Sequence, residues 1–271
     1  MQTQLLEWDI RENPIFANNK KLDNHKAIFR NDNDNLLNVA RKSYTPTTNA
    51  RFVEVVEKMH EITGFPIKCF DEFEGGKKVL AFLECTEPIK VGGYDFEDFM
   101  IIGNSHDSST GFFIGNSSKM IRCANRFSKI FRQLQVHHTR NHDQKIDGLL
   151  RYFENYMKER KELFLSMARM TNTVVDKSIK KALIERLARV HEEESLGIVE
   201  LSARKKNVIS NLDISINHEC FDLGENAFGL FQGVTHYTTH IRKNRENVFG
   251  NALGGASRIN EEAYNFCKAL T

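Results

Sequence analysis

The sequence has no CxxC pair, and its five cysteines lie far apart along the chain. A structural zinc site usually takes its ligands from such closely spaced pairs, so their absence argues against a zinc ribbon. An odd number of separated cysteines is typical of a chain whose thiols stay reduced in the cytosol. We therefore expect neither a zinc ribbon nor a framework of disulfides.

Long apolar runs are missing as well. No stretch approaches the ~18 residues that a membrane-spanning helix needs, and the N-terminus lacks the apolar core of a signal peptide. Charged residues make up 27% of the chain and hydrophobic residues 40%, which is typical of a globular protein in water. We expect a protein of the cytoplasm without a membrane partner.

Motifs of several enzyme classes are also absent. The glycine-rich run at residues 250–255 lacks the Lys-Ser/Thr of a phosphate-binding P-loop and follows no strand-like segment. The chain contains no GxSxG nucleophile motif. We therefore expect no cofactor, and a non-enzymatic role is favoured over an enzymatic one.

Acidic residues are absent between Asp107 and Asp143, although the whole chain has a net charge of only +2. This basic segment carries six cationic residues: Lys119, Arg122, Arg126, Lys129, Arg132 and Arg140. In a helix over Ser118–Leu134, four of the six would lie on one side and the apolar residues on the other. An ordinary solvated helix face explains that pattern too, but such faces usually mix both signs of charge. We therefore interpret the segment as a phosphate-binding face.

Glycine-rich turns and strand-like runs precede the basic segment. A helix is predicted over Asn49–Thr63, with Gly64 as its stop. Strands are predicted over Pro66–Phe73, Lys78–Cys85 and Phe96–Gly103, with a fourth beginning at Gly111. The pairs Gly75-Gly76 and Gly92-Gly93 are typical of hairpin turns. The sequence thus predicts an α+β fold: a helix and an antiparallel meander of three or four strands, with the basic helix packed on it, followed by an α-helical C-terminal half.

Helical spacing of apolar residues dominates the rest of the chain. Helices are predicted over Asp143–Met170, Val174–His191, 200–212, 225–243 and Ala256–Leu270, and residues 213–223 are predicted to be irregular. The first forty residues are rich in Asn, Asp and Lys and predict an extended arm. The expected domains are the arm (1–40), an α+β domain (41–142) and a helical region (143–271).

Histidines and carboxylates suggest a weaker hypothesis, a metal site built from His106, Asp107, His236 or His240. The last two are four residues apart, a helical spacing that can place two imidazoles on one ion. However, Tyr237 follows His236 where a zinc protease has glutamate, and few carboxylates lie near for a two-metal nuclease. We therefore expect these histidines to form hydrogen bonds, and no bound metal.

Several short strings resemble a family of phage and plasmid proteins, number 932 among the domains of unknown function. The strings are Ser43-Tyr44-Thr45-Pro46 with Asn49, Asn104-Ser105-His106-Asp107-Ser108, Ile121-Arg122-Cys123-Ala124-Asn125, His138-Thr139 with Asn141, Ala227-Phe228-Gly229, and Val234-Thr235-His236-Tyr237 with His240. The resemblance runs from about Val39 to the C-terminus, and the chain departs from it in its Asn-rich start and at Ser109. It implies a mobile genetic element, a phage of bacteria, and brings no agreed activity.

The predicted order of helix, antiparallel hairpins and basic helix is also similar to the core of Rad-fifty-two-type single-strand annealing proteins. That resemblance implies a ring that holds single-stranded DNA in a basic groove. It is a likeness of architecture alone, so the charge pattern has to support the function independently.

Together these observations predict a phage-encoded protein that binds single-stranded DNA and anneals or protects it during recombination or replication. The six cations of the basic segment would contact phosphates, and Tyr44, Phe112 and Phe113 are candidates for stacking on bases. We expect a homo-oligomer, a ring or a filament, because aligned subunits cover more nucleotides. Two alternatives stay open: a protein-interaction module that inhibits a host defence or replication factor, and a metal-dependent nuclease.

Overall fold

The computed structural model describes residues 6–86, 89–150, 153–190, 201–242 and 254–271. The chain forms two compact units, each made of three separate stretches. Unit 1 comprises residues 1–87, 98–116 and 130–159, and unit 2 comprises residues 88–97, 117–129 and 160–271. The α+β class is confirmed, whereas the predicted domain boundaries at residues 40 and 142 stay predictions. None of the described helices has the length and apolar character needed to cross a membrane.

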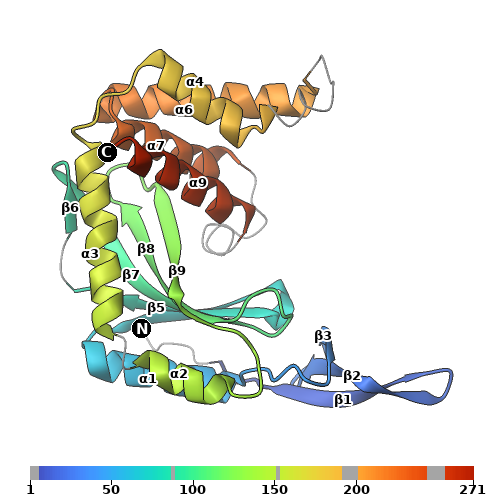
Figure 1. Ribbon diagram of the computed structural model, residues 1–271. Helices are drawn as coiled ribbons and strands as arrows, with labels where there is room; N and C mark the ends of the chain where they lie inside the picture. Colours follow the sequence, from blue (N-terminus) through green and yellow to red (C-terminus); the bar gives the residue numbers. More distant parts are fainter. Residues whose placement is uncertain (1–5, 87–88, 151–152, 191–200, 243–253) are drawn as a thin grey trace. The chain divides into compact units, whose positions relative to one another are not determined.

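The residues predicted as an N-terminal arm form most of a three-stranded antiparallel sheet in unit 1 (Figure 1). Its strands are β1 (Ile10–Ala17), β2 (Lys20–Arg30) and β3 (Leu36–Arg41). Trp8, just before β1, is only 6% exposed and lies against the guanidinium of Arg30, 4.0 Å from its ring centre. Trp8 is therefore packed against the rest of unit 1.

A second sheet has six strands in the order β4-β5-β7-β8-β9, with β6 paired to β7. The strands are β4 (Ile67–Phe73), β5 (Lys78–Glu84), β6 (Ile89–Val91), β7 (Tyr94–Ser105), β8 (Phe112–Met120) and β9 (Arg126–Val136), and the short helix η1 (Glu74–Gly76) joins β4 to β5. Gly75 has φ 68°, and Gly92 and Gly93 also have positive φ in the turn between β6 and β7. Both predicted hairpin turns are confirmed.

Helix α1 (Asn49–Thr63) has the bounds that the sequence predicts. Thr48 caps its first turn by accepting a hydrogen bond from the Arg51 amide, and Gly64 ends it in the left-handed conformation with φ 70°. Its buried face contributes to the core of unit 1 through Phe52, Val55, Val56 and Met59. Unit 1 also contains α2 (His142–Leu150) and the first turns of α3 (Phe153–Met170).

The predicted basic helix over Ser118–Leu134 is wrong. This stretch contains the end of β8, the loop Ile121–Asn125 and most of β9. Neighbouring strands joined by so short a loop must run antiparallel, so β8 and β9 form a hairpin. The apolar spacing that favours a helix arises by coincidence, because Phe127 belongs to the core of unit 2, whereas Phe131 and Leu134 belong to the core of unit 1. The cations of the segment therefore do not share one helical face.

Unit 2 is mainly helical beyond α3, as predicted for the C-terminal half (Figure 1). Its helices are α4 (Lys177–Leu187), α6 (Ala203–Leu223), α7 (Ala227–His236), the π-helical turn η2 (Tyr237–Ile241) and α9 (Gly255–Ala269). Asp176 caps α4 by accepting hydrogen bonds from the amides of Ser178 and Ile179. Residues 213–223, predicted to be irregular, are the second half of α6, and this correction bears directly on the candidate site.

Candidate metal centre

Helix α6 places a carboxylate in a face that otherwise packs into the core. Its buried positions are Leu212, Ser215, Ile216, Glu219, Cys220 and Leu223. They recur every three or four residues, so they form one stripe along the helix. Glu219 is only 1% exposed. A carboxylate buried in this way is costly unless charged or hydrogen-bonding groups surround it.

Two glycines allow α7 to pack closely against α6. A Cβ atom added at Gly233 would lie 2.4 Å from the Cα of Ile216, and one at Gly229 would lie 2.5 Å from the carbonyl oxygen of Gly224. Any larger residue at either position would force the backbones apart. Helix α7 ends three residues after Gly233, at His236. The close packing therefore brings His236 to Glu219.

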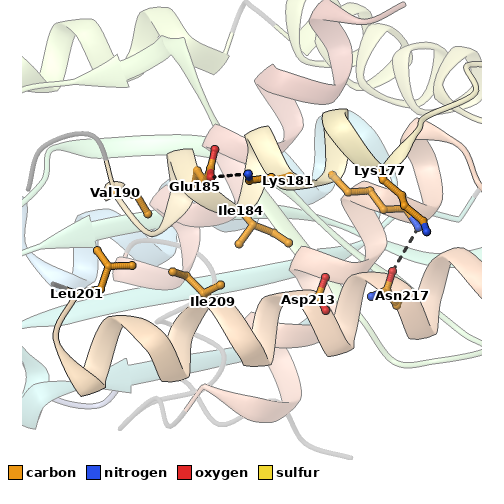
Figure 2. Close-up of a pocket in the computed structure, with 10 residues that line it drawn as sticks. Lys177, Lys181, Ile184, Glu185, Val190, Leu201, Ile209, Asp213 and Asn217 are labelled. Carbon is orange, nitrogen blue, oxygen red and sulfur yellow. Dashed lines mark hydrogen bonds and ion pairs between the residues drawn. The ribbon is translucent and has the colours of Figure 1, made fainter. Parts of the chain in front are cut away.

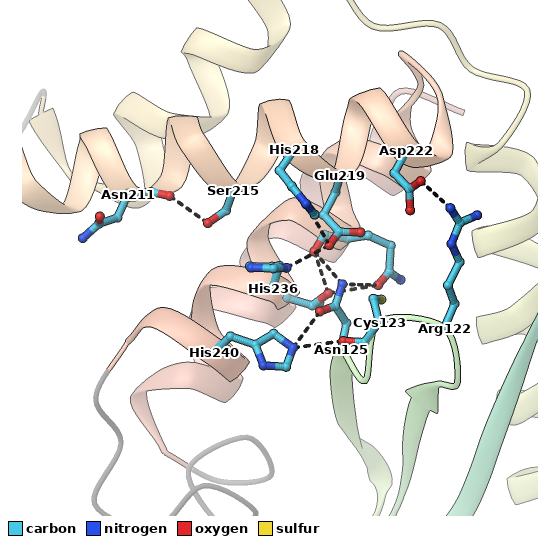
Figure 3. Close-up of polar contacts among 12 residues, drawn as sticks. Arg122, Cys123, Asn125, Asn211, Ser215, His218, Glu219, Asp222, His236 and His240 are labelled. Atoms are coloured by element: carbon cyan, nitrogen blue, oxygen red, sulfur yellow. Dashed lines mark hydrogen bonds and ion pairs between the residues drawn. The ribbon is translucent and has the colours of Figure 1, made fainter.

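The two imidazoles nearest Glu219 come from different helices (Figure 3). His236 Nδ1 lies 2.8 Å from Glu219 Oε1, and His218 Nδ1 lies 3.6 Å from the same oxygen. The second oxygen, Oε2, is buried and has no hydrogen-bond partner among the residues that the structure describes. One carboxylate oxygen is thus surrounded by nitrogen atoms, while the other is unsatisfied.

His218, Glu219 and His236 can serve together as metal ligands, because their ligand atoms all lie within 4.8 Å of one another. Ligands about 2.1 Å from a tetrahedral ion are separated by roughly 3.4 Å, so small rotations of the side chains would be enough. The His218 side chain is 66% exposed, and one side of the cluster faces solvent. Three protein ligands and an open position are typical of catalytic zinc sites, whereas structural sites are closed by four ligands.

His240, expected beside His236, has a different role. Its Nε2 lies 3.1 Å from the carbonyl oxygen of Cys123 and 3.2 Å from Oδ1 of Asn125, both in the β8–β9 loop. Burial lowers the pKa of His240, and the charge of His236 lowers it further. His240 therefore forms hydrogen bonds to the loop, as predicted, while His236 joins the candidate metal centre.

The β8–β9 loop is fixed to the helices of unit 2 at several points. Asn125 Nδ2 donates to the carbonyl oxygen of Gln232, and Arg122 pairs with Asp222 on α6. Burial raises the pKa of the Cys123 thiol to about 11. This thiol therefore stays protonated near neutral pH in the metal-free chain.

Three of the six cations of the basic segment find partners outside it. Lys119 pairs with Glu97 at 3.2 Å, Arg122 pairs with Asp222, and the Lys129 ammonium lies 4.3 Å from the centre of the Tyr264 ring. The missing acids are thus supplied by residues distant in sequence. Arg126 is half-buried and Arg140 is exposed. The side chain of Arg132 lies outside the described residues.

The predicted stacking residues are not available to bases in the way expected. Phe112 and Phe113 are fully buried, and Phe112 lies edge-on to Phe52 in the core of unit 1. Stacking on a base needs an exposed ring face, so both phenylalanines are excluded. Tyr44 is half-buried, and its hydroxyl donates to the carbonyl oxygen of Ser105.

His106, the other predicted metal candidate, belongs to a buried polar cluster in unit 1. Its Nε2 lies 3.0 Å from Oδ1 of Asn49, and its ring contacts Trp8. His138 lies in the same cluster, against the Tyr44 ring. Burial lowers the pKa of both histidines to about 4. Asp107 lies 3.9 Å from the Lys78 ammonium, and it does not join a group of metal ligands among the described residues.

A separate pocket of about 430 Å³ lies between α4 and α6 (Figure 2). Ile184, Val190, Leu201 and Ile209 give it an apolar wall. At its polar end, Lys180 pairs with Glu225 at 2.6 Å, and its ammonium is 3.4 Å from Asn217. None of the three candidate ligands lines this pocket, so it is distinct from the metal centre.

Sequence reasoning missed His218 and Glu219 because residues 213–223 were predicted to be irregular. The spacing of Leu212, Ile216 and Cys220, every fourth residue, is the signal that would extend the helix. If the helix extends to residue 223, Glu219 is an acidic residue within an apolar stripe, and this position identifies it as a candidate site residue.

The short strings that mark the family resemblance assemble into two groups. The strings that contain Asn49, His106 and His138 meet in the buried cluster of unit 1. The strings that contain Asn125, His236 and His240 meet at the candidate metal centre of unit 2. Comparisons with curated proteins and with solved structures return no match. A family model described as a domain of unknown function, DUF932, matches residues 36–260, which include the candidate centre and most of the chain, and the protein therefore belongs to this family.

Proposed function

We propose that this protein binds a divalent transition metal through His218, Glu219 and His236 and acts as a metal-dependent hydrolase. The observation that carries the proposal is the unpartnered Oε2 of Glu219, buried beside two imidazoles. Two histidines, one carboxylate and an open position form a donor set that suits zinc. A metal held in this way supplies a bound water whose pKa falls to about 7, so that hydroxide is available near neutral pH.

A purely structural role explains the site less completely. A hydrogen bond or ion pair between His236 and Glu219 would satisfy Oε1 alone. The second oxygen would then need a water or another partner to relieve its cost of burial. A metal-bound carboxylate removes that cost, and it also explains why His218 and His236 lie on the same side of Glu219.

The zinc content of the purified chain tests this proposal directly. The purified chain, loaded with Zn²⁺ and dialysed, should retain about one ion per chain. Glu219→Gln and His236→Ala each remove a ligand, so each should weaken zinc affinity by more than the roughly 10–100-fold that loss of an outer-shell partner costs. Calorimetric titration of the metal-free protein gives the affinities.

His25→Gln is the matched control, because this histidine lies at an exposed position of β2 in unit 1, away from the candidate ligands of unit 2. It should retain one zinc ion. A chain that holds no metal, or a Glu219→Gln variant that binds zinc as tightly as the parent, would refute the proposal.

Single-stranded DNA binding is a second proposal. What supports it is the basic segment, in which Arg126 and Arg140 form no ion pair with any described residue. A ring or filament would align such residues from many subunits and raise their effective concentration. Docking on a host protein, the other alternative, needs no phosphate contacts at all.

Salt dependence separates these two alternatives. Each phosphate contact to single-stranded DNA contributes about −0.7 to the slope of log affinity against log salt. Arg126→Ala should therefore flatten the slope by about 0.7 and weaken binding about equally for all sequences. Lys68→Ala is the control, since this exposed ammonium is already paired with Glu84 at 3.1 Å. An unchanged slope for Arg126→Ala would favour the interaction module.

A further inference from the structure

We propose that Arg122 and Asp222 form an anion-binding subsite beside the candidate metal centre, and that the substrate carries a phosphate group. This inference rests on the proposed function. The side chain of Arg122 is 52% exposed and pairs with Asp222, which is 35% exposed. Figure 3 shows Arg122 extending from the β8–β9 loop to the turn of α6 that follows Glu219.

The position of Asp222 places this ion pair close to the candidate ligands. Asp222 follows Glu219 by three residues, so the two lie on neighbouring turns of one helix face, with a rise of about 4.5 Å between them. The loop that carries Arg122 is fixed to the same region by His240 Nε2, which lies within hydrogen-bond distance of two acceptors in the loop, the carbonyl oxygen of Cys123 and Oδ1 of Asn125. The guanidinium is therefore tied, through Asp222, to the turn of α6 that follows Glu219.

The charges of the site favour an anionic ligand once a metal is present. Glu219 and Asp222 each contribute one negative charge and Arg122 one positive charge, which leaves −1 without an ion. A divalent ion changes this balance to +1. A phosphate bound to the ion would then be attracted to the guanidinium as well, and a planar guanidinium binds phosphate through two parallel hydrogen bonds.

In the absence of an anionic ligand, the Asp222 carboxylate is paired with the Arg122 guanidinium. Exposed ion pairs are weakly held, so phosphate can replace the carboxylate at little cost. A simpler explanation is that the pair only fastens the loop to α6. In that case, Arg122→Gln and Asp222→Asn should have the same effect on phosphate binding, because each breaks the same ion pair.

The two explanations predict different signs for Asp222→Asn. If Arg122 binds phosphate, this change frees the guanidinium and removes a repelling charge, so phosphate should bind several-fold more tightly. Arg122→Gln should weaken phosphate binding roughly 10–100-fold, the usual worth of a hydrogen bond to a charged group. Arg122→Lys keeps the charge but loses the paired geometry, and its affinity should lie between these values.

The experiment is a calorimetric titration of the full zinc-loaded chain with inorganic phosphate, repeated for each variant and for the metal-free protein. Zinc content and thermal melting are measured on the same samples, so that loss of metal or of fold is not mistaken for loss of phosphate binding. One zinc per chain with equal phosphate affinity in the parent and Arg122→Gln would overturn the subsite alone. Weaker phosphate binding by Asp222→Asn would support the fastening explanation, and it would also overturn the subsite. A chain without zinc would overturn both this subsite and the proposed function.

Discussion

Lowering the pH from 6.5 to 5 should destabilise the folded chain by about 2 kcal/mol for each of His106 and His138. Burial lowers the pKa of both to about 4 in the folded state, while an unfolded histidine titrates near 6.5. Between these values the unfolded chain binds more protons, so stability is lost as the pH falls. The loss begins near pH 6.5 and is complete below about pH 4. Urea unfolding at a series of pH values measures it.

Single variants separate these histidines from the other titrating groups. His106→Gln and His138→Gln should each reduce the difference in unfolding free energy between pH 6.5 and pH 5, since glutamine does not titrate. The reductions caused by the two variants should not be additive, because the charge of His138 lowers the pKa of His106. His25→Gln, at an exposed position of β2, should leave the pH dependence unchanged. A parent protein equally stable at both pH values would contradict the prediction.

Phe127→Ala should cost about 3–5 kcal/mol of stability, the usual cost of removing a buried aromatic ring. Phe127 is 3% exposed, lies edge-on to Phe231 with 5.0 Å between ring centres, and stacks on Tyr264 at 5.3 Å. These three rings belong to the core of unit 2. Urea or thermal unfolding measures the loss.

The neighbouring position provides the comparison. Side chains of successive strand residues point to opposite faces, so Arg126 lies on the other side of β9 from Phe127. It is half-buried and outside the aromatic core, and Arg126→Ala should change stability by less than about 1 kcal/mol. Similar losses for the two variants would mean that Phe127 does not anchor the core as its contacts indicate.

Local signals account for what the sequence predicts correctly. Helix α1 is bounded by a capping threonine and a left-handed glycine, both of which act within a few residues. The Gly-Gly turns mark their hairpins for the same reason. The family strings, too, are short and local, and DUF932 membership follows from them and from the match over residues 36–260.

The errors concern interactions between residues far apart in sequence. The basic segment lacks acids of its own, but Glu97 and Asp222 supply them through the fold. The apolar spacing of β9 fits a helix as well as a strand, and only pairing with β8 decides between them. Glu219 was missed because its role as a candidate ligand depends on His236, a residue of another helix. The close packing at Gly233 brings His236 to Glu219.

The assembly of each unit from three separate stretches has a consequence for fragments of the gene. A fragment that ends at residue 142 lacks Tyr156, a fully buried ring in the core of unit 1. A fragment that begins at residue 143 lacks Phe127 and the Asn125 loop of unit 2. Dividing the chain between residues 142 and 143 therefore leaves the cores of both units incomplete. Deletion mapping cannot assign an activity to one half of this chain, and point substitutions are the appropriate tool for locating it.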